Sequence, residues 1–76
     1  MLIHIKSYGR MQEFIKSGVT NVDAVNTEQL MKLFSANSPG FENVLYRIAI
    51  NNKVIDGNSP ISENDEIGLL PPFAGG

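Results

Sequence analysis

The 76-residue chain has a formal net charge of −2 and contains no cysteine, which excludes several classes of protein. A chain of this length forms one domain, and its slightly negative charge argues against a nucleic-acid partner. Without cysteine there is neither a disulfide framework nor a cysteine-based metal site. His4 is the only histidine, so we expect no metal site of any kind.

The start of the chain, residues 1–6, lacks the basic residues and the long apolar run of a secretion signal. No segment of the sequence reaches the length of apolar chain that crosses a membrane. We therefore expect a cytoplasmic protein that has no membrane partner.

The first predicted element is a strand at residues 2–8, where side chains alternate between two faces. The expected core face consists of Ile3, Ile5 and Ser7, and the expected solvent face of Leu2, His4, Lys6 and Tyr8. Tyr8 is then either a partly exposed aromatic residue or a residue at the rim of the core.

A short helix is predicted at residues 10–17, because apolar residues recur there at helical spacing. Gly18 stands where a glycine commonly ends a helix. Residues 19–25 form a weaker predicted strand, and its polar residues Asn21 and Asp23 favour a place at the sheet edge.

The main helix is predicted at residues 27–37. Asn26 is a good N-cap, and Gln29 three residues later completes the spacing of a capping box. Ser38-Pro39-Gly40 ends the helix. Its apolar stripe, which we expect to pack on the sheet, consists of Leu30, Met31, Leu33 and Phe34.

Two further strands are predicted at residues 45–50 and 66–70, with a short apolar pair at 54–55 between turn-forming residues. In the last strand Ile67 and Leu69 face the core, so Leu70 is expected on the exposed face. The first and last strands should form a parallel pair at the sheet centre. The element order predicts an α+β domain over residues 1–70, with a mixed sheet packed on one main helix.

Residues 71–76 are predicted to form an extended C-terminal tail. Pro71 and Pro72 cannot continue a sheet ladder, so they force an extended exit from the last strand. The six residues can span roughly 20 Å, enough to reach into the active site of another protein. Gly75 and Gly76 have no side chain, so a narrow channel could admit them. The alternative is an ordinary disordered chain end.

These features together resemble the MoaD/ThiS sulfur carriers of the ubiquitin-like β-grasp superfamily. The resemblance covers essentially the whole chain, and it is closest in Ile48-Ala49-Ile50-Asn51, Pro60-Ile61 and residues 65–76. These look like the family pattern "AVN … PL … GDEV … PPVAGG". Residues 8–13 match the family stretch "FAxLRE" more loosely. The Pro-Pro pair favours the MoaD branch, the small subunit of molybdopterin synthase, over the thiamine branch.

The resemblance implies a two-stage carrier that binds no cofactor itself. A MoeB-like adenylating enzyme would use ATP to activate the terminal carboxylate of Gly76. A sulfurtransferase would then replace one carboxylate oxygen with sulfur, which gives a thiocarboxylate. The tail would enter a MoaE-like large subunit and donate its sulfur to a cyclic pterin phosphate. Family members assemble in this way as a heterotetramer with two large subunits.

The residues agree with this chemistry on two points. A sulfur carrier without cysteine needs another atom to hold the sulfur, and the terminal carboxylate is the obvious one. A carboxylate must be activated before substitution, and the chain contains no nucleotide-binding motif of its own. No serine has the histidine and acid neighbours of a nucleophile. A solvated turn explains Asp65-Glu66 better than acid–base catalysis.

The resemblance also places Tyr8, Val54 and Leu70 in an apolar patch that docks the partner. Val54 could equally make an ordinary packing contact inside the domain. Phe73 stands where the family commonly has a smaller apolar residue, and it either anchors the tail in a partner pocket or folds back on the domain. The expected partner-binding tail consists of Pro71, Pro72, Phe73, Ala74 and Gly75, and Gly76 is the reactive residue.

Other functions remain open on the sequence. A carrier of this shape could serve thiamine or tRNA thiolation in place of molybdopterin synthesis. Gly76 could instead form an isopeptide bond with a target lysine, as in a ubiquitin-like protein modifier. A binding-only β-grasp module with an incidental Gly-Gly end is the third class.

Overall fold

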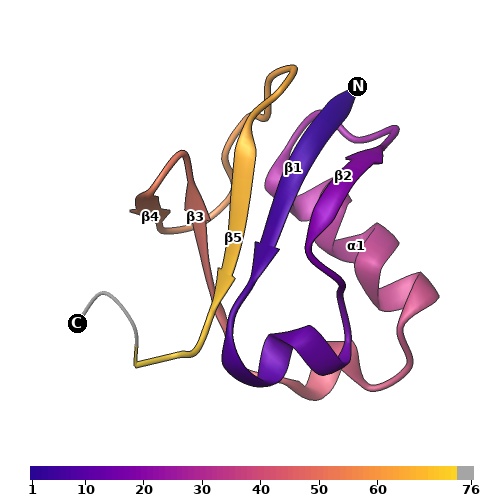
Figure 1. Cartoon of the computed structure of the whole chain (residues 1–76), viewed down its shortest axis with the longest axis vertical. Helices are drawn as coiled ribbons and strands as arrows, with labels where there is room; N and C mark the ends of the chain where they lie inside the picture. The colour runs from indigo at the N-terminus through magenta and orange to yellow at the C-terminus, as the bar shows by residue number, and fades with distance from the viewer. Residues whose placement is uncertain (74–76) are drawn as a thin grey trace.

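A computed structural model describes residues 1–73 as a five-stranded sheet packed against one α-helix (Figure 1). The helix α1 spans Thr27–Asn37, and the strands are β1 (Leu2–Ser7), β2 (Gly18–Asn21), β3 (Arg47–Ile50), β4 (Lys53–Ile55) and β5 (Glu66–Leu70). The strand order is β2-β1-β5-β3-β4. β1 and β5 are parallel, and the other neighbours in the sheet are antiparallel. This confirms the predicted α+β class and the β-grasp fold.

The parallel pair β1–β5 forms the centre of the sheet, as predicted. Ile5 lies opposite Ile67 and Ser7 opposite Leu69. The backbone N–H of Tyr8 donates to the carbonyl oxygen of Leu69 at 3.0 Å, which continues the ladder beyond β1. The end of β5 is therefore held by the strand that begins the chain.

The core lies between the sheet and α1. The predicted inner faces are correct, since Ile3, Ile5, Ser7, Ile67 and Leu69 are all buried. Phe41, for which no role is predicted from the sequence, is fully buried in the 3₁₀ helix η2 (Phe41–Asn43). Its ring stacks on Tyr46 at 5.0 Å between centroids and meets the edges of Phe14 and Phe34. This aromatic cluster fixes the chain between α1 and β3.

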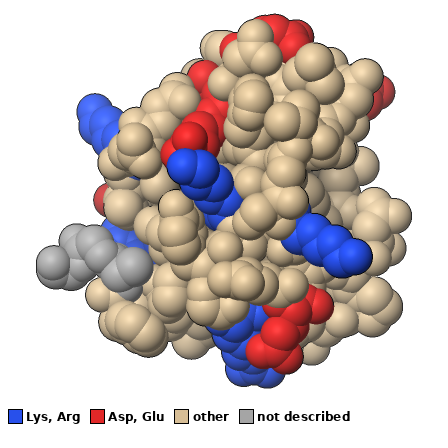
Figure 2. Space-filling model, viewed as in Figure 1, with Lys and Arg blue, Asp and Glu red and all other residues tan. Residues whose placement is uncertain are grey.

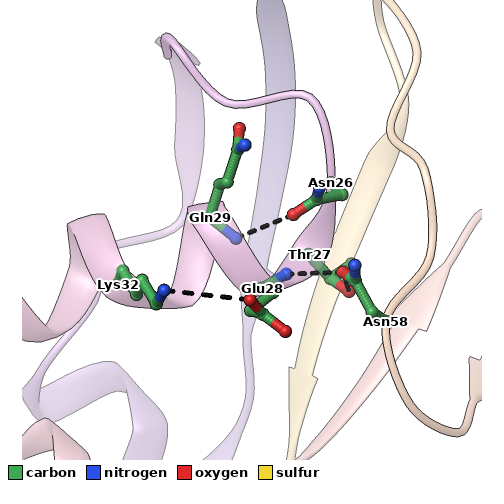
Figure 3. Close-up of polar contacts among 6 residues, drawn as sticks. All are labelled: Asn26, Thr27, Glu28, Gln29, Lys32 and Asn58. Carbon is green, nitrogen blue, oxygen red and sulfur yellow. Dashed lines mark hydrogen bonds and ion pairs between the residues drawn. The ribbon is translucent and has the colours of Figure 1, made fainter.

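The start of α1 has two side-chain caps, one of which comes from a distant loop (Figure 3). Asn26 Oδ1 accepts from the N–H of Gln29 at 2.9 Å, as the capping pattern predicts. Gln29 Oε1 reaches back to the N–H of Val25 and not to that of Asn26. Asn58 Oδ1 accepts from the N–H of Glu28 at 2.9 Å and from the Thr27 hydroxyl at 3.2 Å. The second cap joins the helix to the loop after β4.

Four predictions about local structure are wrong. Residues 10–17 do not form an α-helix; the chain makes the 3₁₀ helix η1 (Gly9–Glu13) and a turn, because Gly18 must return to pair with Ile5. Gly18 begins β2 and does not end a helix. The edge strand ends at Asn21, short of residue 25. β3 begins only at Arg47, so Leu45 precedes the strand.

Candidate functional site

The sheet face turned away from α1 has a hollow at its centre. Gly68 pairs with Lys6 on one side and with Ala49 on the other, and Ala49 pairs with Val54. Gly68 and Ala49 are small and buried, so they form a low floor. The hollow has a volume of about 160 Å³, and its lining is Tyr8, Ala49, Asn52, Val54, Glu66, Gly68 and Leu70.

The structure brings the three predicted docking residues together around this hollow. Tyr8 is 43% exposed, and it follows the end of β1. Val54 and Leu70 are half-buried. Leu70 was expected to be exposed. It instead lies on the wall of the hollow beside Gly68, where part of the Leu70 side chain is hidden from solvent. Lys6 Nζ and Glu66 Oε2, 3.4 Å apart, place an ion pair beside the apolar lining.

The chain leaves the end of β5 along a short segment, Pro71–Phe73, that we call the stalk (Figure 1). Pro71 is half-buried, and its Cγ lies 3.4 Å from the position that a Cβ on Gly9 would occupy. Pro72 is exposed, and Phe73 is 83% exposed. Of the two predictions for Phe73, folding back into the domain is thus wrong. Ala74, Gly75 and Gly76 lie outside the described residues.

A larger groove runs along the stalk, and the sequence analysis missed it. Its volume is about 450 Å³, and its lining is Gly9, Arg10, Met11, Asn43, Val44, Leu45, Pro71, Pro72 and Phe73. Leu45 was assigned to a strand but is 77% exposed at the groove. Its position two residues before Arg47 was the available signal, since that spacing places it on the outer face of the predicted strand.

Charges of both signs are scattered over the surface shown in Figure 2, and most of that surface is uncharged. Arg47 lies 3.5 Å from Asp56, and Lys32 lies 3.8 Å from Glu28. Within residues 1–73, no three His, Cys, Asp or Glu side chains gather as they would around a metal ion. No helix in the same residues is both long and apolar enough to cross a membrane. Two largely apolar features stand out: the hollow at the centre of the sheet face and the groove beside the exposed stalk.

Comparisons with known proteins agree with this arrangement. The model of the ThiS family matches residues 5–76. The chain is also similar to a chain in the solved protein–protein complex of subunits 1 and 2 of molybdopterin-converting factor from Helicobacter pylori 26695. That match has 29% identity and a TM-score of 0.67, and it covers 100% of both chains. No curated protein matches the sequence. With nearly all of its length matched to the family, the chain belongs to the ThiS family of sulfur carriers.

Proposed function

We propose that this chain is the sulfur-carrying small subunit of molybdopterin synthase. The observation that supports it most is the exposed stalk, which continues from the central strand β5 and leaves Phe73 largely in solvent. A central strand gives the tail a rigid base, and the two prolines direct it away from the sheet. The similar chain from Helicobacter pylori occurs in a complex of two subunits, which supports a large-subunit partner here.

The proposed activation takes place on the terminal carboxylate of Gly76. A carboxylate oxygen attacks the α-phosphorus of ATP in a MoeB-like enzyme, and pyrophosphate leaves. A sulfide equivalent supplied by a sulfurtransferase then attacks the acyl carbon of the adenylate, and AMP leaves. The product is a thiocarboxylate. Because Gly76 has no side chain, its carboxylate oxygen can reach the phosphorus, and the sulfide equivalent can later reach the acyl carbon, without steric hindrance.

In the proposed transfer step, the thiocarboxylate sulfur displaces an oxygen substituent from a carbon of a cyclic pterin phosphate inside a MoaE-like large subunit, and that oxygen leaves with the electron pair of the broken C–O bond. Water then cleaves the resulting thioester, which leaves the sulfur on the pterin and restores the carboxylate on Gly76. The product, molybdopterin, contains a dithiolene with two sulfur atoms, so each product molecule needs two tails that carry a thiocarboxylate. A heterotetramer with two large and two small subunits would meet that need.

In this proposal the described residues bind the large subunit and direct the C-terminal tail toward it. The hollow around Gly68 offers an apolar seat for the large subunit, with Tyr8, Val54 and Leu70 on its walls. Burial of such a central apolar contact is the usual source of affinity in a protein interface. Pro71–Phe73, which include a turn at Pro72 and Phe73, then lead into the last three residues, which would reach toward the pterin.

The mass of the intact protein from native cells tests the proposal. We expect a species in which one oxygen is replaced by sulfur, and we expect it to convert the cyclic pterin phosphate when mixed with the large subunit. A variant without Gly76 is the control, and it should do neither. Covalent adducts of higher mass would indicate a protein modifier. A thiocarboxylate that converts no pterin would indicate another thiolation pathway.

A further inference from the structure

The two most exposed large hydrophobic side chains among residues 1–73 line the same groove. They are Phe73, at 83% exposure, and Leu45, at 77%. Single exposed apolar residues are common on protein surfaces, but contiguous apolar patches mark interaction sites. Val44 and Pro72 also line the groove and extend its apolar surface.

The exposure of Leu45 is a consequence of the fold. Phe41 and Tyr46, four residues before Leu45 and one residue after it, stack on each other at 5.0 Å. Val44 has an extended backbone, and its N–H donates to the carbonyl oxygen of Phe41 at 3.1 Å. Because successive side chains of an extended segment point to opposite sides, an inward Tyr46 holds Leu45 outward.

We propose that this groove receives a protruding apolar side chain of the large subunit, flanked by a carboxylate. The inference rests on the proposed function. The stalk residues Pro71, Pro72 and Phe73 line the groove, so a protein that binds along the stalk also lies over the groove. Arg10 is the only charged residue of the lining, which favours an acidic group beside the apolar one.

The hollow around Gly68 extends along β5 from Glu66 to Leu70, and the groove lies just beyond the end of that strand. The hollow includes Leu70 and Tyr8, whereas the groove begins with the next residues, Pro71 and Gly9. The large subunit would therefore contact the base of the stalk on both surfaces. Such a two-sided contact would fix the direction in which the tail enters.

The test compares two exposed apolar residues at different places on the surface. Leu45→Asp removes the groove residue, and Val25→Asp changes a residue that is 59% exposed and lines neither the hollow nor the groove. The probe is the molybdopterin synthase large subunit from the same genome, titrated by calorimetry. We expect Leu45→Asp to weaken binding by about tenfold or more and Val25→Asp to change it by less than about twofold.

Two further measurements complete the test. Thermal unfolding should be nearly the same in both variants and in the unsubstituted protein, because both side chains are exposed. Pyrophosphate release by the activating enzyme should also be unchanged. An unchanged affinity of Leu45→Asp for the large subunit would overturn the assignment of the groove to that subunit. The same holds if the variant binds normally and only its adenylation is impaired.

Failure of this inference differs from failure of the proposed function. If the unsubstituted protein binds the large subunit and converts pterin, and Leu45→Asp does both equally well, only the groove assignment is wrong. If the unsubstituted protein neither binds the large subunit nor converts pterin, both proposals are wrong.

Discussion

Gly68 of β5 lies directly opposite Ala49 of β3 on the sheet face turned away from α1. A Cβ placed on Gly68 would meet the Cβ of Ala49 at 3.5 Å, an ordinary van der Waals distance. The glycine is therefore not required for packing between the strands. What its missing side chain provides is depth in the hollow.

This relationship predicts that Gly68→Ala makes the protein more stable and its partner contact poorer. Replacing a strand glycine by alanine should raise the free energy of unfolding by roughly 0.5–1 kcal/mol. The added methyl group makes the hollow shallower, so affinity for the large subunit should fall. Urea unfolding and calorimetry measure the two effects on the same sample. An affinity that is unchanged, or higher, would show that the partner does not use the hollow.

Leu70→Glu should weaken binding to the large subunit by about tenfold, because it places a charge on the apolar wall of the hollow. Since Leu70 is half-buried, we also expect a loss of roughly 1 kcal/mol in the free energy of unfolding. Leu33→Glu is the matched control, because Leu33 is 37% exposed and lies on α1. If the control weakens binding equally, the effect of Leu70→Glu is not specific to the hollow.

Adding one phenylalanine after Gly76 should abolish sulfur transfer and leave the domain folded. The added side chain would obstruct a narrow channel, and the carboxylate would no longer belong to glycine. Circular dichroism checks the fold, and conversion of cyclic pterin phosphate checks the transfer. Retained conversion by the intact extended chain would contradict the proposed role of Gly76.

Asn58→Ala should destabilise the protein by about 1–2 kcal/mol without changing sulfur transfer at saturating partner. The variant removes the oxygen that accepts from the N–H of Glu28 and from the Thr27 hydroxyl, and a lost helix cap costs about this much. Asn58→Asp keeps an acceptor at the same place and should retain most of the stability. Equal losses in both variants, measured by thermal unfolding, would argue against the cap.

Burial raises the pKa of the Tyr46 hydroxyl above its usual value of 10.0. The folded state thus binds this proton more tightly than the unfolded state. The associated stability is present below the unfolded pKa and is lost as the pH rises through the folded value. We expect the free energy of unfolding to fall more steeply above about pH 10 in the unsubstituted protein than in Tyr46→Phe. Parallel urea-unfolding profiles for the two proteins would contradict this.

Alternation of apolar residues made the central strands predictable. Ile3 and Ile5 of β1 and Ile67 and Leu69 of β5 are apolar and buried, so strand, face and parallel pairing follow from the sequence. Asn26 likewise marked the start of α1 because its side chain caps locally. The sequence could not show Asn58 as the second cap, since that contact joins residues 30 positions apart.

The parts of the fold that the sequence did not predict depend on distant partners. Helical spacing of Met11, Phe14 and Ile15 favoured an α-helix, but the pairing of Gly18 with Ile5 leaves room only for a 3₁₀ turn. Leu45 looked like a strand residue, and its exposure arises from Phe41 and Tyr46 stacking beneath it. Tyr8 and Leu70 were predictable as outward residues, whereas the floor of the hollow required the register of β3 on β5.

The pairing of β1 with β5 determines when the chain can fold during its synthesis in the cell. β1 can pair with β5 only after residues 66–70 have been synthesised. Without β5, the sheet lacks its central strand and cannot form. Nascent or clipped chains that lack this stretch should stay unfolded and be degraded. Any copy that survives as a compact domain would then already possess β5, the strand that leads into the stalk at Pro71.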